Sequence, residues 1–197
     1  DASVGDPQRC SQYARSIYAY LKEREAKYLL PADYMQSQRD INSNMRSILV
    51  DWLVAEEYKV VPETLHLCVS YIDRFLSRVP VARSKLQLVG ASCLLLLIKH
   101  HHLRQISPHL PISPRQVDEF VYISDSTYTR AEILAMASTA LTRPRHLPDT
   151  STTLPRHFLG VHPAQAACGV DETAASLCSY LCELTLPEYA LLAFRPS

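Results

Sequence analysis

The residues most suggestive of chemistry are four histidines, His100 to His102 and His109, in a proline-containing stretch that ends near Pro114. Imidazole is a common zinc ligand, so this cluster raises a metal site as one hypothesis. Adjacent histidines cannot all face one ion from one side of a helix, and no cysteine or carboxylate follows at ligand spacing. We therefore expect residues 100–114 to form a solvated loop that holds no metal.

The cysteines are a second place to look for chemistry. The 6 cysteines form no C-x-x-C pair, and Cys68 and Cys93 lie in apolar runs, where a free thiol behaves as a small hydrophobe. Cys178 and Cys182 would share one face of a helix, for which packing is expected rather than metal binding. The pattern indicates free thiols in a reducing, intracellular compartment, with a nuclear or cytoplasmic location or both.

No arrangement typical of an enzyme occurs in the sequence. There is no Ser–His–Asp set, no His-Glu-x-x-His motif, no P-loop and no dinucleotide-binding glycine pattern, and the chain has only 4 glycines. The sequence therefore predicts a protein that is not an enzyme and uses no cofactor.

The composition narrows the remaining classes of protein. The chain has 197 residues, 47% of them hydrophobic, and its 20 basic and 20 acidic side chains balance to a formal net charge of zero. A nucleic-acid-binding surface needs a clustered excess of lysine and arginine, so none is expected. The longest unbroken apolar run, residues 93–98, is far too short to cross a bilayer. We predict a globular protein that binds neither nucleic acid nor a membrane.

Hydrophobic periodicity predicts an all-α fold, because no segment of any length alternates with the period of a strand. Helices are expected over residues 6–28, 43–59, 62–78, 83–99, 113–124, 129–142 and 172–186, with a linker over 31–43. The 83–99 segment is apolar almost all round, which is typical of the central helix of a bundle. Thr129 and Glu132 have the spacing of a capping box.

The last predicted helix presents three leucines, Leu177, Leu181 and Leu184, on one side. Such a stripe must be covered by neighbouring elements or remain as an apolar patch that promotes association. Either outcome is expected to depend on how this helix meets the preceding bundle.

Several motifs in a fixed order carry a family resemblance. Residues 45–54, which read MRSILVDWLV, resemble the opening of a cyclin box. Further stretches similar to that family are ETL at 63–65, YIDRFL at 71–76, KLQLVG at 85–90, DEFVYI at 118–123 and YLCELTL at 180–186. The pattern resembles mitotic A- and B-type cyclins and is nearer to the B-type group in the tail. It divides the chain into an N-terminal helix (1–30), a first cyclin box (31–147) and a degenerate, truncated start of a second box (148–197).

The resemblance implies a five-helix fold that serves as the regulatory subunit of a cyclin-dependent protein kinase and does no chemistry itself. It implies kinase-binding positions at Lys99 and Leu88. The family's glutamate in the fifth helix corresponds to Ala137, so that carboxylate is lost. In the family, this lysine and glutamate together hold the kinase's αC helix in its active position.

The resemblance also implies a shallow apolar groove for substrate peptides of the Arg-x-Leu type. Its residues would be Met45, Ile48, Leu49, Trp52 and Gln87, while the groove's acidic residue is replaced by Ala55. The spacing of these side chains, taken without the family, indicates only a helix face that packs on a core. Arg46 and Asp73 match an internal ion pair of the family that is structural.

Three features depart from the family pattern. The segment between Trp52 and Glu63 is shorter, the stretch after Lys99 is longer, and residues 142–170 have little family character. Two functions therefore stay open. One is a kinase-regulatory subunit, competent or weakened in its binding. The other is a kinase-independent helical interaction protein or a non-activating, truncated cyclin isoform.

Overall fold

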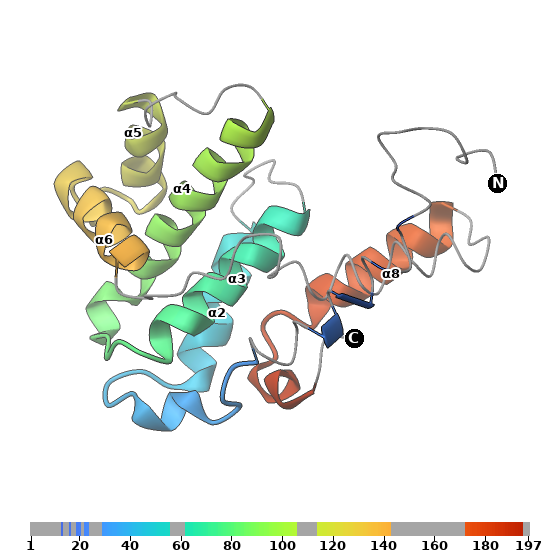
Figure 1. The fold of residues 1–197 in the computed structure, drawn as a ribbon. Helices are drawn as coiled ribbons and strands as arrows, with labels where there is room; N and C mark the ends of the chain where they lie inside the picture. Colours follow the sequence, from blue (N-terminus) through green and yellow to red (C-terminus); the bar gives the residue numbers. More distant parts are fainter. Residues whose placement is uncertain are drawn as a thin grey trace.

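The computed structural model describes residues 13, 16, 19, 20, 22, 23, 29–55, 62–105, 114–142 and 172–194. This part of the chain is helical and holds no strand, which confirms the all-α prediction (Figure 1). Most of the predicted N-terminal helix, and residues 148–171 of the predicted second box, lie outside the described ranges. The α-helices are α2 (Ser43–Ala55), α3 (Pro62–Leu76), α4 (Leu86–Gln105), α5 (Pro114–Ile123), α6 (Arg130–Thr142) and α8 (Glu172–Leu184). Short 3₁₀ helices are η2 (Tyr34–Ser37), η3 (Arg83–Lys85) and η5 (Tyr189–Ala193).

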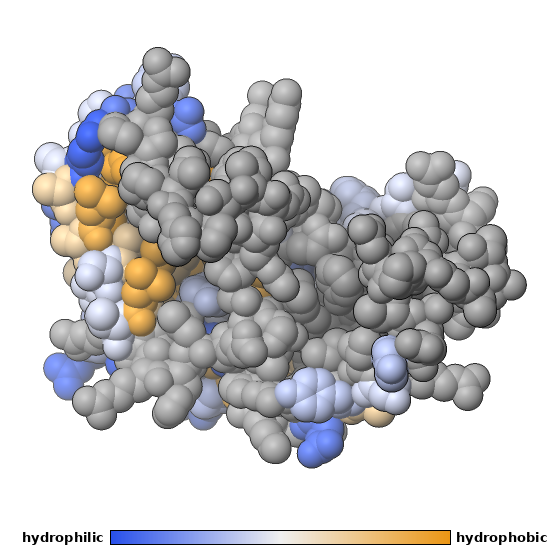
Figure 2. All heavy atoms as spheres, turned by 45° about the horizontal axis from the view of Figure 1, so that its top comes forward, coloured by the Kyte–Doolittle hydropathy of each residue, from blue (hydrophilic) through white to orange (hydrophobic). Residues whose placement is uncertain are grey.

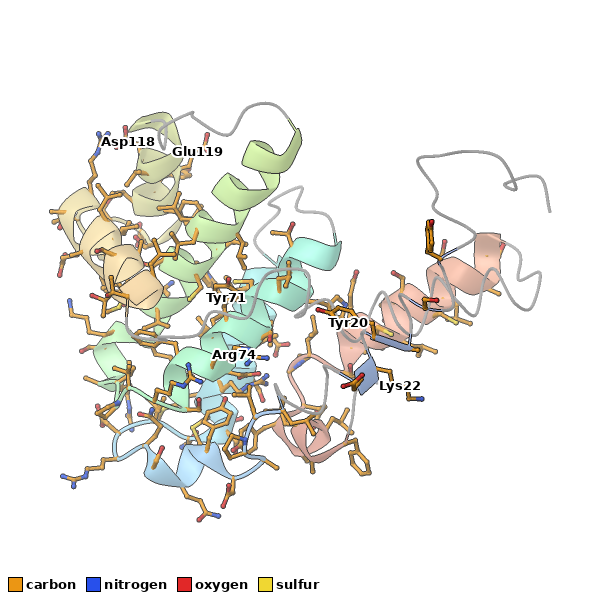
Figure 3. All side chains as sticks on the ribbon, in the orientation of Figure 1. Tyr20, Lys22, Tyr71, Arg74, Asp118 and Glu119 are labelled. Carbon is orange, nitrogen blue, oxygen red and sulfur yellow. The ribbon has the colours of Figure 1, made fainter. Side chains whose placement is uncertain are left out.

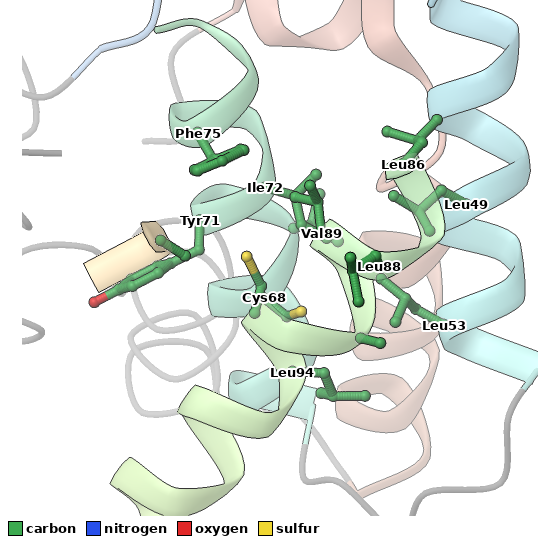
Figure 4. Packing of buried hydrophobic residues seen from close by; sticks show 14 of the residues in the cluster. Leu49, Leu53, Cys68, Tyr71, Ile72, Phe75, Leu86, Leu88, Val89 and Leu94 are labelled. Carbon is green, nitrogen blue, oxygen red and sulfur yellow. The ribbon is translucent and has the colours of Figure 1, made fainter. Parts of the chain in front are cut away.

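Helix α4 is the centre of the bundle, as its apolar character predicted. It contacts α2, α3, α5 and α6, and nearly every residue from Leu86 to Leu97 is buried. In the core between α3 and α4, Cys68 and Ile72 face Val89 and Leu94 (Figure 4). A helix without a polar side is stable only when neighbours cover its whole circumference, and here they do.

Helix α4 reaches further than the sequence predicted. We expected a helix over 83–99 followed by a histidine-containing loop, but the helix continues to Gln105 and includes His100 to His102. The physical reason is that no proline or glycine interrupts the chain after Lys99 until Pro108. The expected start is also different, because residues 83–85 form the 3₁₀ helix η3.

Helices α2 and α4 pack unusually closely at Gly90. A β-carbon at this position would lie 2.8 Å from Cδ1 of Leu49, which is closer than real β-carbons come to other atoms. The absence of a side chain at Gly90 therefore lets the leucine of α2 sit directly on the backbone of α4.

The stretch predicted as a linker, residues 31–43, is instead part of the core. Tyr34, Met35 and Ile41 are buried. The Gln38 amide donates to the carbonyl oxygens of Leu76 at 2.5 Å and Val79 at 2.7 Å, and its oxygen accepts from Val81 N at 3.0 Å. The prediction was wrong because these contacts are made by an irregular segment, and hydrophobic periodicity detects only regular helices and strands.

The turn between α5 and α6 holds two non-glycine residues in the left-handed region. Asp125 has φ 51° and Ser126 has φ 56°. The Ser126 N–H donates to the carbonyl oxygen of Val121 at 3.0 Å, which closes the end of α5. A side chain at positive φ is strained, more so for serine than for aspartate.

Ser126→Gly is expected to raise the free energy of unfolding by about 0.5–1 kcal/mol, because relief of left-handed strain exceeds the entropy that glycine loses on folding. Thr127→Gly is the matched control, since Thr127 is not at positive φ and should be destabilised. Urea unfolding of both variants measures the difference. A loss of stability in Ser126→Gly would contradict the strain.

The predicted capping box at the start of α6 is confirmed. Glu132 accepts from Thr129 N and from Thr129 Oγ1, both at 3.0 Å, and Glu132 N donates to Thr129 Oγ1 at 3.3 Å. Lys85 donates to the other carboxylate oxygen at 2.8 Å and lies 5.5 Å from the centre of the Tyr128 ring. Tyr128 in turn donates to the carbonyl oxygen of Ser84 at 2.7 Å. This cluster ties the start of α6 to η3, just before α4.

This cluster predicts a pH dependence of stability. Hydrogen bonds from Lys85 and Thr129 lower the pKa of Glu132 from 4.5 to about 2. A lowered carboxyl pKa stabilises the folded state above the ordinary value, and that contribution is lost as the pH falls from 4.5 towards 2. Glu132→Gln should therefore be less stable than the wild type at pH 6, and the difference should shrink below pH 4.5 and disappear only at or below about pH 2. Urea midpoints across this range test the prediction, and a pH-independent difference would contradict it.

Candidate functional site

The outer face of α2 is the first candidate surface. Ile48 is 59% exposed, and Met45, Trp52 and Gln87 are partly buried, so these four side chains remain available for contact. Leu49 corrects the prediction, since it is only 4% exposed and packs against Gly90. Leu49 belongs to the core beneath this face. The apolar stripe of α2 lies partly against the core and partly against solvent.

Two of the predicted kinase-binding residues, Lys99 and Leu88, belong to α4. Lys99 lies in α4, but its side chain is outside the described part of the structure. Leu88 is 2% exposed and lies in the core, so the prediction that it contacts a kinase is wrong. Leucine positions on an all-round apolar helix cannot be assigned to a surface from spacing alone.

Ala137 lies on the inner side of α6. It is 3% exposed and shares this buried face with Ile133 and Ala140. Ser92 of α4 donates to the Ile133 carbonyl oxygen at 3.2 Å, which fastens the two helices where they cross. The methyl group at Ala137 is thus a packing contact, and the position offers no acceptor to a partner.

The ion pair predicted between Arg46 and Asp73 is present and is buried. Arg46 Nε lies 2.6 Å from Asp73 Oδ1, and Nη2 lies 2.8 Å from Oδ2, so the pair is bidentate. Tyr34 Oη also donates to Asp73 Oδ1 at 2.6 Å. The guanidinium joins α2 to α3, while the tyrosine brings in the segment that sequence reasoning took for a linker.

Arg46 also reaches the C-terminal part of the chain. Its Nη1 donates to the carbonyl oxygens of Leu186 at 2.9 Å and Pro187 at 3.1 Å. The Tyr189 hydroxyl accepts from Met35 N at 3.0 Å, and its ring meets the Tyr34 ring edge-on with centroids 5.3 Å apart. Residues 186–189 are therefore built into the first box rather than hanging from it. Sequence reasoning missed this junction, since carbonyl acceptors leave no signal in side-chain patterns.

Burial and the Asp73 carboxylate shift the pKa values of two side chains at this junction, Tyr34 and Arg46. Burial, together with the adjacent Asp73 carboxylate, raises the pKa of the Tyr34 hydroxyl well above its usual range. Burial alone opposes the charge of Arg46, but the hydrogen bonds to Asp73, the charge of that carboxylate and the interactions with Tyr34 together outweigh burial and raise the pKa of the guanidinium. The tyrosine stays neutral and the arginine charged, so both groups serve the structure of the junction.

Helix α8 keeps an apolar side that the described part of the chain does not cover. Leu177, Leu181 and Leu184 are each more than half exposed, although α8 contacts α3 and Leu186 joins the core. A second exposed apolar area lies on α5 and α6 and includes Tyr122, Leu134 and Leu141. Hydrophobic side chains of this side form the strip at the left of Figure 2.

Two acidic side chains in the middle of α5, Asp118 and Glu119, point outwards. Both are exposed, and Figure 3 shows them on the outer side of the helix. Asp118 pairs with Arg130 at the start of α6. These groups decorate the surface and converge on no common site.

No group of histidine, cysteine and carboxylate side chains suited to a metal ion occurs within the described ranges. Cys68 and Cys93 are free and buried, and burial raises the pKa of the Cys93 thiol to about 12. They are inert core residues, as predicted. Cys178 was expected to pack against other residues, but it is exposed. None of the described helices is both long and apolar enough for a membrane span.

The described part of the chain is a helical bundle around one central apolar helix, with exposed apolar side chains on α2, α5, α6 and α8. The sequence matches the family "Cyclin, N-terminal domain" over residues 16–143. The chain therefore belongs to the cyclin family.

The chain is similar to A-type cyclins. It is 42% identical to Cyclin-A1-1 of Arabidopsis thaliana over 206 residues, covering 100% of this chain and 42% of that protein. It is 44% identical to the G2/mitotic-specific cyclin-A of Hydra viridissima over 188 residues, covering 94% of this chain and 42% of that one. The chain thus spans about two fifths of the length of these relatives. The predicted leaning to B-type cyclins is not supported.

A solved structure shows the same fold. A viral cyclin from Herpesvirus saimiri superposes with a TM-score of 0.70 at 23% sequence identity, covering 92% of this chain and 76% of that chain. At this identity the likeness bears on the fold alone.

Proposed function

We propose that this chain is a regulatory subunit of the A-type cyclin class that binds and activates a cyclin-dependent protein kinase in cell-cycle control. The observation that carries the proposal is the first cyclin box, whose helices α2 to α6 are all present around a closed core. Lys99 lies in the last two turns of α4, and the sequence resemblance makes it the counterpart of the family's kinase-binding lysine. Free, buried thiols support a nuclear or cytoplasmic location, or both.

The outer face of α2 supports a second role within the same proposal. Ile48 with the partly buried Met45, Trp52 and Gln87 would hold a substrate peptide of the Arg-x-Leu type, with Leu49 supporting them from the core. Ala55 provides no carboxylate for the peptide's arginine, so this docking is expected to be weak.

Lys99→Ala is expected to weaken kinase binding by roughly 30-fold or more, because donors that satisfy buried backbone carbonyls at an interface are costly to remove. Arg130→Ala is the matched control, since Arg130 is exposed at the start of α6, which the Lys85–Glu132 contact ties to η3, at the opposite end of α4 from Lys99. Titration of a cyclin-dependent kinase against the three proteins measures the effect. Histone phosphorylation in the same mixtures separates binding from activation.

A different result would favour the second candidate, a kinase-independent helical interaction protein. The observation in its favour is Ala137, a buried methyl group at the position where the family has a kinase-gripping glutamate. If the wild type fails to bind at micromolar kinase, the regulatory function is wrong for this chain. If it binds without raising histone phosphorylation, the chain is a non-activating cyclin isoform.

A further inference from the structure

Three arginines, Arg39, Arg78 and Arg83, stand out among the cations of the described ranges. All three are exposed, and none of them makes an ion pair with another described residue. Other cations there behave differently, since Arg46, Lys85 and Arg130 each meet a carboxylate. We refer to Arg39, Arg78 and Arg83 together as the arginine corner.

The fold, rather than the sequence, brings the three together. Arg39 lies between two anchored residues. Gln38 bonds to the backbone of Leu76, Val79 and Val81, and Asp40 Oδ2 accepts from Arg83 N at 2.7 Å. Residues 38–40 therefore run beside residues 79–83, at the lower left of Figure 1, where the blue segment before α2 meets the green segment before α4.

The corner has an anchored backbone, and its three cations outnumber the one adjacent carboxylate, Asp40. Its backbone is held by hydrogen bonds of 2.5 to 3.0 Å to a buried glutamine, so the three side chains start from fixed points. The neighbouring Asp40 uses one carboxylate oxygen on a backbone N–H, and Glu132 is engaged by Lys85 and its own cap. Like charges gathered on a fixed scaffold repel one another, and a bound anion would relieve this repulsion.

We propose that the arginine corner binds a carboxylate-rich segment of a protein partner. Guanidinium groups are planar and can grip carboxylates through two parallel hydrogen bonds, which suits them to acidic peptides. A protein partner fits better than nucleic acid, because the corner is small and the chain has a formal net charge of zero. The corner also leads directly into α2, whose outer side chains include the exposed Ile48 and Val54 and the partly buried Trp52. Binding of an acidic segment at the corner would need neither Lys99 nor a kinase.

The test uses a fluorescein-labelled octaglutamate peptide as the probe and the full chain at low ionic strength. Arg39→Gln, Arg78→Gln and Arg83→Gln should each weaken binding roughly two- to fivefold, the scale of exposed ion pairs, and the triple variant should weaken it by about tenfold or more. Arg130→Gln is the matched control, because Arg130 is an exposed arginine that already has Asp118 as its partner. It should bind the peptide like the wild type.

Two further probes separate the sources of negative charge. A peptide of the same length carrying phosphoserine and a single-stranded oligonucleotide are titrated alongside octaglutamate. The proposal predicts that octaglutamate binds in an arginine-dependent and salt-sensitive manner. It is overturned if the wild type does not bind octaglutamate, if the triple variant binds it equally well, or if only the phosphopeptide or the oligonucleotide depends on the corner. Thermal unfolding checks that the arginine variants remain folded. Removing mutually repelling charges should leave their melting temperature unchanged or raised.

Discussion

Replacing Arg46 with methionine should lower the free energy of unfolding by about 3–5 kcal/mol, the scale for breaking a buried ion pair from one side. Methionine fills a similar volume but leaves the Asp73 carboxylate buried with Tyr34 as its remaining donor. The substitution also removes the donors to the carbonyl oxygens of Leu186 and Pro187. Urea unfolding of the whole chain measures the loss.

Two controls make this result specific to the pair. Arg46→Met combined with Asp73→Leu removes both charges and should recover most of the stability, because no unpaired ion remains. Hydrogen exchange should show lost protection of residues 185–194 in both variants, since the contact of Arg46 with that segment is absent in each. A loss below about 1 kcal/mol in the single variant would show that water or another group compensates Asp73.

Phe120→Ala is expected to cost about 3–5 kcal/mol, the range for removing a buried aromatic ring. Phe120 is 1% exposed and lies on the inner side of α5, which faces α4 and α6. Removing the ring would leave a cavity and remove packing contacts between α5 and its neighbours. The substitution therefore tests whether α5 is part of the cooperative core.

Tyr122→Ala is the matched control, an aromatic truncation two residues further along the same helix. Tyr122 is 82% exposed, so its loss should change stability by no more than about 0.5 kcal/mol. Equal effects of the two substitutions would mean that Phe120 does not face the core, contrary to the orientation of α5 in the structure. Thermal and urea unfolding of the pair provide the comparison.

The helices were predictable where a local signal marks their ends. Helix α6 begins where the Thr129–Glu132 capping box places it, and α3 begins at Pro62, which suits a first helical turn. Helix α4 ran past its predicted end because that prediction took the histidines for a loop signal, although histidine does not break a helix. The segment around Gln38 was mistaken for a linker, since its role depends on carbonyl groups more than thirty residues away.

The candidate sites were less predictable than the helices. The partnership of Arg46 and Asp73 was correct, because both charges lie beside apolar stripes and buried charges must be paired. The surface roles of Leu49 and Leu88, which only the resemblance implied, do not fit their burial, whereas the spacing of Leu49 correctly indicated a face that packs on the core. The arginine corner has no sequence signature, since Arg39 lies far along the chain from Arg78 and Arg83.

The sequence by itself determined that this protein is a helical bundle of the cyclin family, because hydrophobic period, caps and motif order are local properties that survive without the fold. Only the tertiary structure decided which side chains are available to a partner. Burial depends on what lies across from a residue, as Leu49 on Gly90 shows, and that neighbour comes from a distant part of the chain. The same holds for the junction at Arg46, where α2, α3 and the segment after α8 meet through backbone carbonyls that every residue possesses.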